Sequence, residues 1–205
     1  MKRGLFITFE GGEGAGKTTL INEMARQLMV EGHHVLKTRE PGGTKLGEHI
    51  RMILLEHTEP VSPYAELSLF LASRAQHIME VIGPALVEEK IVLCDRFNDS
   101  SVAYQGAARG LGMEQVRAFC KFISQGVQPQ LTFYLDLDPK IGLARAAKER
   151  KQDRIESETL IFHQKIREAF VAIHNADPHR FQLIDATLPP AKVFEEAMKK
   201  VRVYV

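Results

Sequence analysis

The chain has 205 residues, of which 26% are charged, and its formal net charge is +1 at pH 7. This length suits one domain with a sizeable core, and the balance of basic and acidic residues argues against nucleic acid as a partner. No apolar run reaches the roughly 18 residues that a membrane span needs, and a strand pattern begins at Leu5 without a leader segment. The two cysteines, Cys94 and Cys120, lack metal-ligand spacing. We therefore expect a cytoplasmic protein that binds small anions and neither a membrane nor nucleic acid.

Short apolar runs alternate along the chain with longer segments of helical periodicity, which is typical of a parallel sheet covered by helices on both faces. The expected strands are Leu5–Phe9, His34–Arg39, Ile91–Asp95, Leu131–Leu137 and Phe181–Asp185. The expected helices are Thr18–Val30, Leu46–Leu55, Pro63–Glu88, Met113–Ser124, Pro139–Ala147, Glu156–Asn175 and Ala191–Val201. We predict an α/β fold with a five-stranded parallel sheet, in which ligands gather at the carboxyl ends of the strands.

The first strand runs into the segment Gly11–Thr18, which reads GGEGAGKT and fits the phosphate-binding pattern GxxxxGK[ST] at every fixed position. Its glycines let successive backbone N–H groups turn inward at a helix N-terminus, where the helix dipole also favours an anion. We expect Lys17 to reach the outer phosphates of a nucleotide and the Thr18 hydroxyl to bind Mg²⁺. A turn without a ligand would have no use for Lys-Thr at this offset. The predicted nucleotide-binding residues are Gly11, Gly12, Glu13, Gly14, Ala15, Gly16, Lys17, Thr18 and Thr19.

The loop after the second strand, Thr38–Thr44, contains one proline and two glycines, so it could be only a sharp strand-to-helix connection. Its Arg39 nevertheless suits a phosphate, because a guanidinium offers paired donors. Arg51 lies one to two helical turns beyond the loop. Two arginines beside one phosphate would form an anion site.

The helix predicted over Pro63–Glu88 carries Phe70 and Arg74, which lie four residues apart and hence on one face. A phenylalanine in a helix is usually core and an arginine usually solvated. In this long segment between two strands, however, the pair could stack on a base and hydrogen-bond it.

The third predicted strand ends in the pair Asp95-Arg96. A carboxylate at this place could organise Mg²⁺ or its waters, and the arginine could hold a substrate phosphate; the alternative is a plain ion pair at a strand end. The next residues include Ser101, Tyr104 and Gln105, which offer neutral hydrogen-bonding groups and an aromatic ring. Such groups suit a base and a sugar, although by itself the stretch would be an ordinary polar helix start.

The segment from residue 140 to residue 154 is strongly basic. A solvated helix face is the usual interpretation of such a run. Phosphoryl transfer offers a sharper one, because charge builds on the transferring group and a mobile basic lid can neutralise it while excluding water. We favour the lid. Its basic residues are Lys140, Arg145, Lys148, Arg150, Lys151 and Arg154.

Taken together, these stretches resemble the thymidylate kinases, which phosphorylate dTMP, over nearly the whole chain. The P-loop alone is shared with many unrelated NTPases, whereas the ordered set is close to family-specific. The resemblance implies a P-loop NTPase fold, ATP as co-substrate, Mg²⁺, a homodimer, and one domain over residues 1–205 with a lid insertion at about 142–154. The stretches that carry it are Phe9–Thr19, Thr38–Thr44, Phe70 with Arg74–Gln76, Asp95–Phe97, Asp99–Ser101, Ala103–Gly106 and Asp153–Glu156.

The same resemblance implies a set of contacts to dTMP. Tyr104 would pack beneath the deoxyribose and disfavour a 2′-hydroxyl. The implied contacts are Phe70 and Arg74 to the base, Ser101 and Gln105 to its edge, Tyr104 and Glu13 to the sugar, and Arg39, Arg51 and Arg96 to the phosphate.

The chain departs from the family's pattern at three positions. Ser73 stands where many relatives have Asp, and Phe97 where many have Tyr. One branch of the family has a catalytic arginine where this chain has Gly14, so the chain looks like the bacterial branch, in which the lid supplies that arginine. The lid candidates are Arg150 and Arg154, followed by Arg145.

The mechanism expected from these residues is in-line transfer of the γ-phosphoryl group of ATP to a phosphate oxygen of dTMP, with Lys17, Arg96 and a lid arginine as catalytic residues and with Mg²⁺ at Thr18 and Asp95. No general base is needed, because a phosphomonoester with a second pKa of about 6 is largely dianionic at neutral pH. Two alternatives stay open. The first is a kinase for another small acceptor, in which Glu40 could be a base. The second is a nucleotide-dependent switch, although the guanine-reading Asn-Lys-x-Asp motif does not occur in the sequence.

Overall fold

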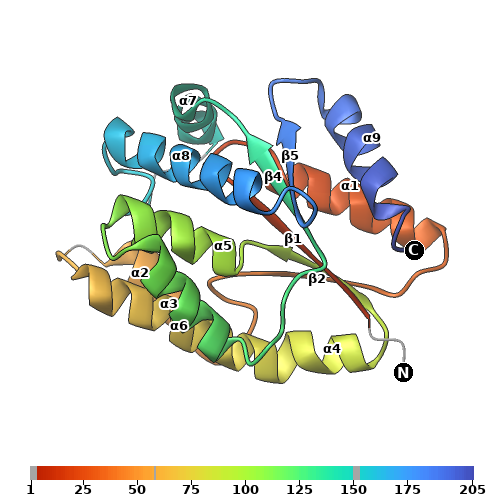
Figure 1. The fold of residues 1–205 in the computed structure, drawn as a ribbon, viewed down its shortest axis with the longest axis horizontal. Helices are drawn as coiled ribbons and strands as arrows, with labels where there is room; N and C mark the ends of the chain where they lie inside the picture. The colour runs from red at the N-terminus through yellow and green to blue at the C-terminus, as the bar shows by residue number, and fades with distance from the viewer. Residues whose placement is uncertain (1–3, 58, 150–152) are drawn as a thin grey trace.

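A five-stranded parallel sheet with the strand order β2-β3-β1-β4-β5 forms the centre of the molecule (Figure 1). The computed structural model describes residues 4–57, 59–149 and 153–205. Every pair of neighbouring strands is parallel, with Phe9 opposite Asp95 and Phe133 in adjacent strands. This confirms the predicted α/β architecture. The strands are β1 (Leu5–Gly11), β2 (Val35–Arg39), β3 (Ile91–Asp95), β4 (Leu131–Asp136) and β5 (Phe181–Asp185).

Some of the helices begin where a polar side chain accepts a hydrogen bond from a free backbone N–H group. The hydroxyl of Thr44 accepts a hydrogen bond from Gly47 N (2.9 Å), and that of Ser62 accepts one from Ala65 N (3.2 Å). The helices are α1 (Lys17–Val30), α2 (Lys45–Glu56), α3 (Pro63–His77), α4 (Gly83–Val87), α5 (Asn98–Ser101), α6 (Met113–Ile123), α7 (Pro139–Glu149), α8 (Leu160–Ala176) and α9 (Pro190–Val201), with π-helical segments η1 (Ile78–Ile82) and η2 (Val102–Ala108). In the described part of the chain, none of the helices has both the length and the apolar character that crossing a membrane requires.

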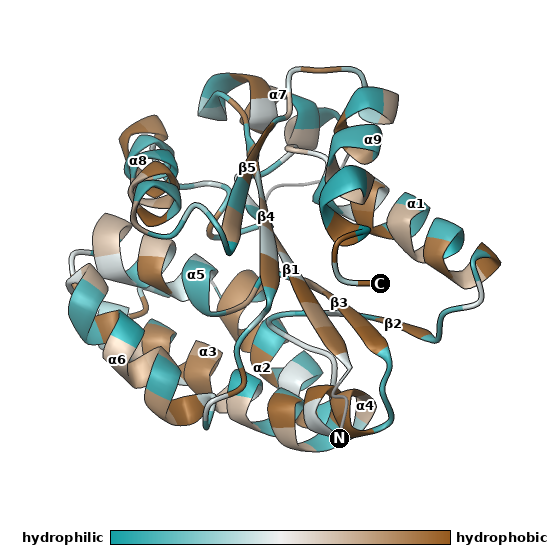
Figure 2. Ribbon diagram, turned by 45° about the vertical axis from the view of Figure 1, so that its right-hand side comes forward, coloured by the Kyte–Doolittle hydropathy of each residue, from teal (hydrophilic) through white to brown (hydrophobic). Residues whose placement is uncertain are grey.

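The two faces of the sheet bury different sets of side chains, because alternate strand residues point to opposite sides. Ile7 and Leu93 pack with Leu20 of α1 and Val193 of α9. Their neighbours Phe6 and Val92 face the other way, towards η1 and α4. Figure 2 shows the apolar strands enclosed between these helical layers. The layers hold the carboxyl ends of β1, β2 and β3 side by side.

An aromatic cluster fixes α8 to β4 and β5 of the sheet. Phe170 of α8 lies 5.0 Å from Tyr134 of β4 and 6.1 Å from Phe181 of β5, measured between ring centroids. Tyr104 of η2 contacts Phe170 and Phe162 edge-on at 6.4 and 6.3 Å. The packing therefore sets the position of a tyrosine that the sequence placed in the site.

Two segments differ from the sequence-based expectation. The helix predicted over Pro63–Glu88 is interrupted by η1, where the N–H group of Gly83 bonds to Ile78 O. Pro84 follows directly, and a proline inside a helix removes an N–H donor and crowds the preceding turn, which explains the change in hydrogen bonding. The sequence pattern did not predict the helical segment α5–η2 and indicated only a polar helix start there, because Asn98–Ser101 is a run of poor helix formers.

Candidate active site

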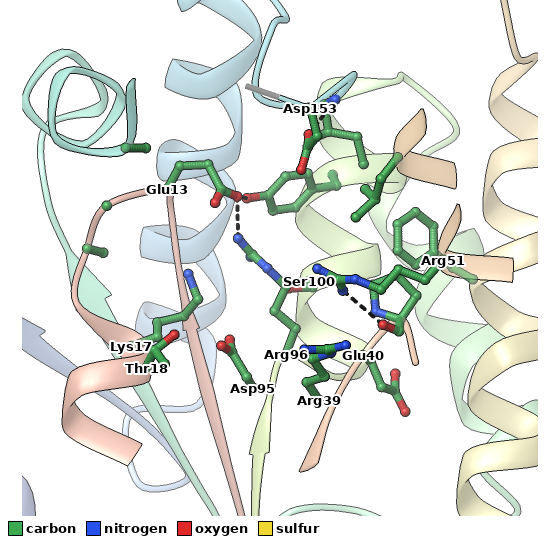
Figure 3. A pocket seen from close by; sticks show the side chains of 18 of the residues that line it. Glu13, Lys17, Thr18, Arg39, Glu40, Arg51, Asp95, Arg96, Ser100 and Asp153 are labelled. Atoms are coloured by element: carbon green, nitrogen blue, oxygen red, sulfur yellow. Dashed lines mark hydrogen bonds and ion pairs between the residues drawn. The ribbon is translucent and has the colours of Figure 1, made fainter. Parts of the chain in front are cut away.

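A pocket of about 450 Å³ opens at the carboxyl ends of β1, β2 and β3 (Figure 3). Most predicted site residues line this pocket, so the structure brings them together. Three do not line it, namely Gly11, Gly12 and Arg154, and Arg150 lies outside the described residues. The predicted residues that line it are Glu13, Gly14, Ala15, Gly16, Lys17, Thr18, Thr19, Arg39, Arg51, Phe70, Arg74, Asp95, Arg96, Ser101, Tyr104 and Gln105.

Lys17 spans the P-loop from the first turn of α1. Its Nζ donates hydrogen bonds to Gly11 O (3.2 Å) and Gly12 O (3.1 Å). Burial, together with the nearby charge of Arg96, lowers the pKa of Lys17, while the carboxylate of Asp95 works in the opposite direction. An ammonium group has three donors and carries no acceptor. Two of these donors bind the loop, so the third N–H group of Lys17 can donate to an anion bound there.

The P-loop packs directly against α7 through two glycines. Gly14 has a φ of +63°, and a Cβ atom at this position would collide with Gly142 O. A Cβ atom on Gly142 would in turn collide with Glu13 O. This contact between the P-loop and α7 leaves no room for a side chain at Gly14. Arg145, three residues after Gly142 on α7, lines the pocket. Helix α7 therefore brings Arg145 next to the P-loop.

Asp95 and Thr18 lie on the same side of the pocket as Lys17 (Figure 3). Asp95 Oδ1 is buried and has no hydrogen-bond partner among the described residues. Within the same ranges, no cluster of three or more histidine, cysteine or acidic side chains could hold a metal ion by itself. Mg²⁺ is usually held by one or two protein oxygens together with waters and substrate phosphates. The orphaned carboxylate oxygen and the hydroxyl fit such an ion.

Arg96 is a fixed cation between the P-loop and the far wall of the pocket. Its guanidinium donates to Gly11 O (3.0 Å), to Glu13 Oε1 (2.5 Å) and to Ser100 Oγ (3.3 Å), and it lies 5.0 Å from the ring centroid of Tyr104. Burial disfavours its charge, yet Tyr104 and the neighbouring carboxylates hold the pKa of Arg96 above its ordinary value. The side chain is charged and oriented before any substrate arrives, which suits electrostatic stabilisation of a phosphate.

Glu10 is a supporting residue that the sequence reasoning missed. Its Oε1 accepts from Phe97 N (2.9 Å) and Ser100 N (3.3 Å), and its Oε2 accepts from Ser100 Oγ (2.5 Å). Burial and the charge of Asp99 raise the pKa of Glu10 to about 7. These bonds hold the backbone directly after Arg96. Arg96 itself has a φ of 69°, which is unusual for a residue with a side chain. The available signal was an acidic residue inside an apolar strand just before the P-loop.

Arg39 and Arg51 form the outer wall of the pocket beside Arg96 (Figure 3). Arg51 NH1 donates to Pro41 O (2.9 Å), and Arg39 NH2 donates to Glu48 Oε2 (3.0 Å). The side chain of Arg39 is 54% exposed, so this ion pair exchanges readily with water or a ligand. Three arginines thus approach one region of the pocket.

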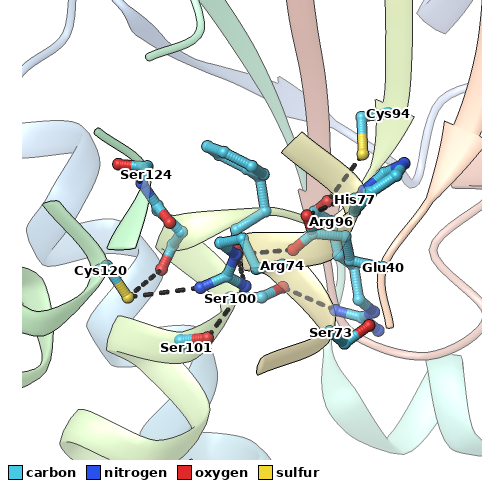
Figure 4. A network of polar contacts seen from close by, with 12 residues as sticks. Glu40, Ser73, Arg74, His77, Cys94, Arg96, Ser100, Ser101, Cys120 and Ser124 are labelled. Carbon is cyan, nitrogen blue, oxygen red and sulfur yellow. Dashed lines mark hydrogen bonds and ion pairs between the residues drawn. The ribbon is translucent and has the colours of Figure 1, made fainter. Parts of the chain in front are cut away.

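Arg74 anchors a buried polar network at the other end of the pocket (Figure 4). Its Nε donates to Glu40 Oε2 (2.6 Å), and its NH2 donates to Phe97 O (3.0 Å) and Ser101 Oγ (3.1 Å). The second oxygen of Glu40 lies 3.0 Å from His77 Nδ1. Both carboxylate oxygens of Glu40 therefore already have partners, Arg74 and His77, so Glu40 is not available as a general base. This speaks against an acceptor that needs deprotonation.

The two departures from the family's pattern near Arg74 have local partners. Ser73 Oγ accepts from Gly42 N (3.2 Å), which ties α3 to the loop after β2. The ring of Phe97 packs edge-on against Phe6 at 5.0 Å and lies 5.2 Å from the guanidinium of Arg74. Neither residue lines the pocket, and both support the network around Arg74.

The lid arginines occupy different places. Arg154 donates to Leu54 O (2.9 Å) and to Glu66 Oε2 (2.7 Å), so its guanidinium is bound outside the pocket in this structure. Arg145, which the sequence ranked below Arg154, lines the pocket. Further lining residues that the sequence did not single out as site residues are Pro41, Leu55, Ser100, Ala146, Asp153 and Ile155. Most of these are small or apolar and carry no distinctive chemistry.

Comparisons with known proteins agree with this geometry. A family model described as thymidylate kinase matches residues 9–197. A thymidylate kinase from Protochlamydia amoebophila is 50% identical over 206 residues, covering 96% of this chain and 92% of that protein. One from Chlamydia trachomatis serovar D is 43% identical over 203 residues, covering 98% of this chain and 100% of that protein. The crystal structure of thymidylate kinase from Ehrlichia chaffeensis superposes with a TM-score of 0.78 at 33% identity, over 96% of this chain and 97% of that one. The chain therefore belongs to the thymidylate kinase family.

Proposed function

We propose that the pocket of Figure 3 is the place where this chain phosphorylates dTMP to dTDP with ATP, the reaction of the family to which it belongs. The observation that carries the proposal is that the P-loop and three arginines line one cavity. A phosphate donor and a phosphorylated acceptor can thus be held side by side, which is the main requirement of phosphoryl transfer.

The P-loop side of the cavity would hold ATP. Lys17 and the backbone N–H groups of the loop would bind its outer phosphates. Thr18 and Asp95 would hold Mg²⁺, with Asp95 Oδ1, which has no hydrogen-bond partner among the described residues, as one ligand. When bound, this ion neutralises charge on the phosphates and helps to align them.

The arginine side of the cavity would hold the phosphate of dTMP. Arg39, Arg51 and Arg96 offer paired donors to its oxygens. No residue needs to remove a proton, because a phosphomonoester is largely dianionic above its second pKa of about 6. The base would stack on Phe70 at the end of the pocket where Arg74 lies.

The charge that builds up on the transferring group needs a further cation on the lid side. We propose Arg145 for this role, because it is the lid arginine that lines the pocket within the described residues. Arg154 would have to leave Glu66 to take its place, and Arg150 lies outside the described residues. The single domain with a lid insertion at about 142–154 stays part of this proposal, and α7 forms the first part of that range.

We further propose a homodimer that covers the side formed by α2, α3 and α6 (Figure 1). Large apolar side chains are exposed there, with Phe119 at 55% and Phe122 at 79% on α6. Met52 and Ile53 on α2 are also about half exposed. Sedimentation equilibrium should give twice the chain mass, and a monomer for the Phe122→Lys variant. The cytoplasmic location and the absence of membrane and nucleic-acid partners remain predictions.

Steady-state kinetics of ADP formation test the proposed function. We expect ADP formation to require an acceptor, with dTMP strongly preferred. Arg51→Ala should raise the KM for dTMP at least tenfold while the KM for ATP changes less than about twofold. Arg26→Ala is the matched control, since Glu23 is the one side chain that Arg26 pairs with among the described residues, on the exposed face of α1. Equal changes of both KM values in Arg51→Ala, or ADP formation without an acceptor, would contradict the assignment.

A further inference from the structure

Glu66 of α3 is the centre of a buried ion cluster next to the base end of the pocket. Its Oε1 accepts from Arg109 Nε (3.1 Å) and Gln105 Nε2 (2.9 Å). Its Oε2 accepts from Arg109 NH2 (3.2 Å) and Arg154 NH2 (2.7 Å). The side chain is 1% exposed. Both carboxylate oxygens are therefore fully engaged, and one of the partners is a residue that lines the pocket.

The carboxyl group of Glu66 is ionised at neutral pH. Burial alone would raise its pKa, but hydrogen bonds from Arg109, Gln105 and Arg154 outweigh burial and hold the pKa below its ordinary value. An ionised carboxylate accepts hydrogen bonds and donates none. Glu66 can therefore bind the NH₂ end of a neighbouring amide and cannot bind its oxygen.

This restriction fixes the orientation of the Gln105 side chain. With Nε2 held by Glu66, Oε1 must point away from the carboxylate. Gln105 lines the pocket, and its Oε1 has no hydrogen-bond partner within the described ranges. Arg74 lines the same end of the pocket and has only donors. The pocket thus presents an acceptor oxygen and donor groups at its base end.

We propose that Glu66 determines the specificity for the base by locking the Gln105 amide with its oxygen towards the pocket, so that the site matches the thymine edge and rejects the cytosine edge. This inference rests on the proposed function. Thymine has a donor at N3–H and an acceptor at O4, which complement Gln105 Oε1 and Arg74. Cytosine has an acceptor at N3 and a donor amino group at C4, so both contacts would be mismatched. Glu66 touches no substrate and acts through Gln105.

The test compares dTMP with 5-methyl-dCMP, which has the same methyl group, sugar and phosphate and differs only at this edge. The wild-type enzyme should prefer dTMP by about 10³-fold or more in kcat/KM, because the mismatched analogue leaves buried polar groups unpaired. The amide of Glu66→Gln can either donate or accept, so Gln105 can turn over. We expect the preference for dTMP to fall by about tenfold or more in this variant.

Glu158→Gln is the matched control for loss of charge in the cluster. Glu158 Oε1 accepts from Arg109 NH1 (2.5 Å), at the far side of the cluster from Gln105. This variant should keep the wild-type ratio within about twofold. A Glu66→Gln enzyme that keeps the wild-type ratio, or an equal loss of preference in both variants, would overturn the inference.

If Glu66→Gln does not fold, Gln105→Met replaces it, since methionine has a similar length and removes the acceptor. An unchanged preference in Gln105→Met would also overturn the inference. The proposed function fails separately. It fails if the wild-type enzyme does not phosphorylate dTMP, whereas turnover of dTMP with an unchanged ratio in the variants refutes only the role of Glu66.

Discussion

Glu10 offers the sharpest prediction about stability. The residue is 0% exposed, and burial together with the charge of Asp99 raises its pKa from 4.5 to about 7. The perturbation is Glu10→Gln. Glutamine has nearly the same shape, can accept from the N–H groups of Phe97 and Ser100 through its oxygen, and can donate to Ser100 Oγ. It differs mainly in that it does not titrate.

The sign and size of the effect follow from proton linkage. Between about pH 4.5 and 7, native Glu10 holds a proton that the unfolded chain has released, so the free energy of unfolding falls as pH rises. The stabilisation is complete below the unfolded pKa and is lost as pH passes the folded pKa. One pKa unit corresponds to about 1.4 kcal/mol, so the whole loss is about 3 kcal/mol. The side chain is fully buried, and screening by solvent does not reduce this figure.

Urea denaturation of wild type and Glu10→Gln at about pH 5 and pH 8 measures the effect. Other titrating groups contribute equally to both proteins and cancel in the difference. We expect wild type to lose about 2.5 kcal/mol relative to the variant between these two pH values. Parallel pH dependence of the two proteins would refute the argument that burial raises the pKa of Glu10 in the folded protein.

Three further outcomes follow from the site. Lys17→Ala should lower kcat/KM by about 10³-fold or more, with the free energy of unfolding changed by less than about 1 kcal/mol, and near-normal turnover would remove the P-loop lysine from the mechanism. Gly142→Ala should lower both stability and kcat, because the new Cβ atom meets Glu13 O; a gain of about 1 kcal/mol, as expected for an unhindered helix position, would show that α7 does not rest on the P-loop. Asp95→Asn should raise the Mg²⁺ concentration for half-maximal activity about tenfold, and an unchanged value in a titration of rate against Mg²⁺ would exclude Asp95 from the ion's site.

The sequence predicted the site best where the functional residues are adjacent along the chain. The P-loop is one contiguous pattern, and Lys17 lies in the structure where that pattern predicts. The sheet also followed from pattern, because its strands are apolar runs bounded by turn residues. Since parallel strands bring their carboxyl ends to one edge, the convergence of Arg39 and Arg96 on the P-loop could be predicted without knowing a single contact.

The sequence was least informative where a role depends on contacts between distant segments. Glu10 accepts hydrogen bonds from residues 87 and 90 positions away. An acidic residue in an apolar strand is unusual, but the sequence around it does not identify these partners. Arg145 and Arg154 belong to one basic run, and only the glycine contact of α7 and the ion pair with Glu66 separate their positions. Likewise, the helix at Asn98–Ser101 forms from poor helix formers because Glu10 accepts hydrogen bonds from the N–H groups of Phe97, the N-cap residue, and Ser100.

The measurement that tests the central claim most directly is ADP formation with ATP and Mg²⁺, comparing dTMP with dUMP, dCMP, dGMP and UMP as acceptors. The account predicts a strong preference for dTMP, because Phe70, Arg74 and Gln105 line the base end of the pocket and Tyr104 lines the region proposed for the sugar. Equal use of several acceptors, or ADP formed at the same rate with none, would contradict it.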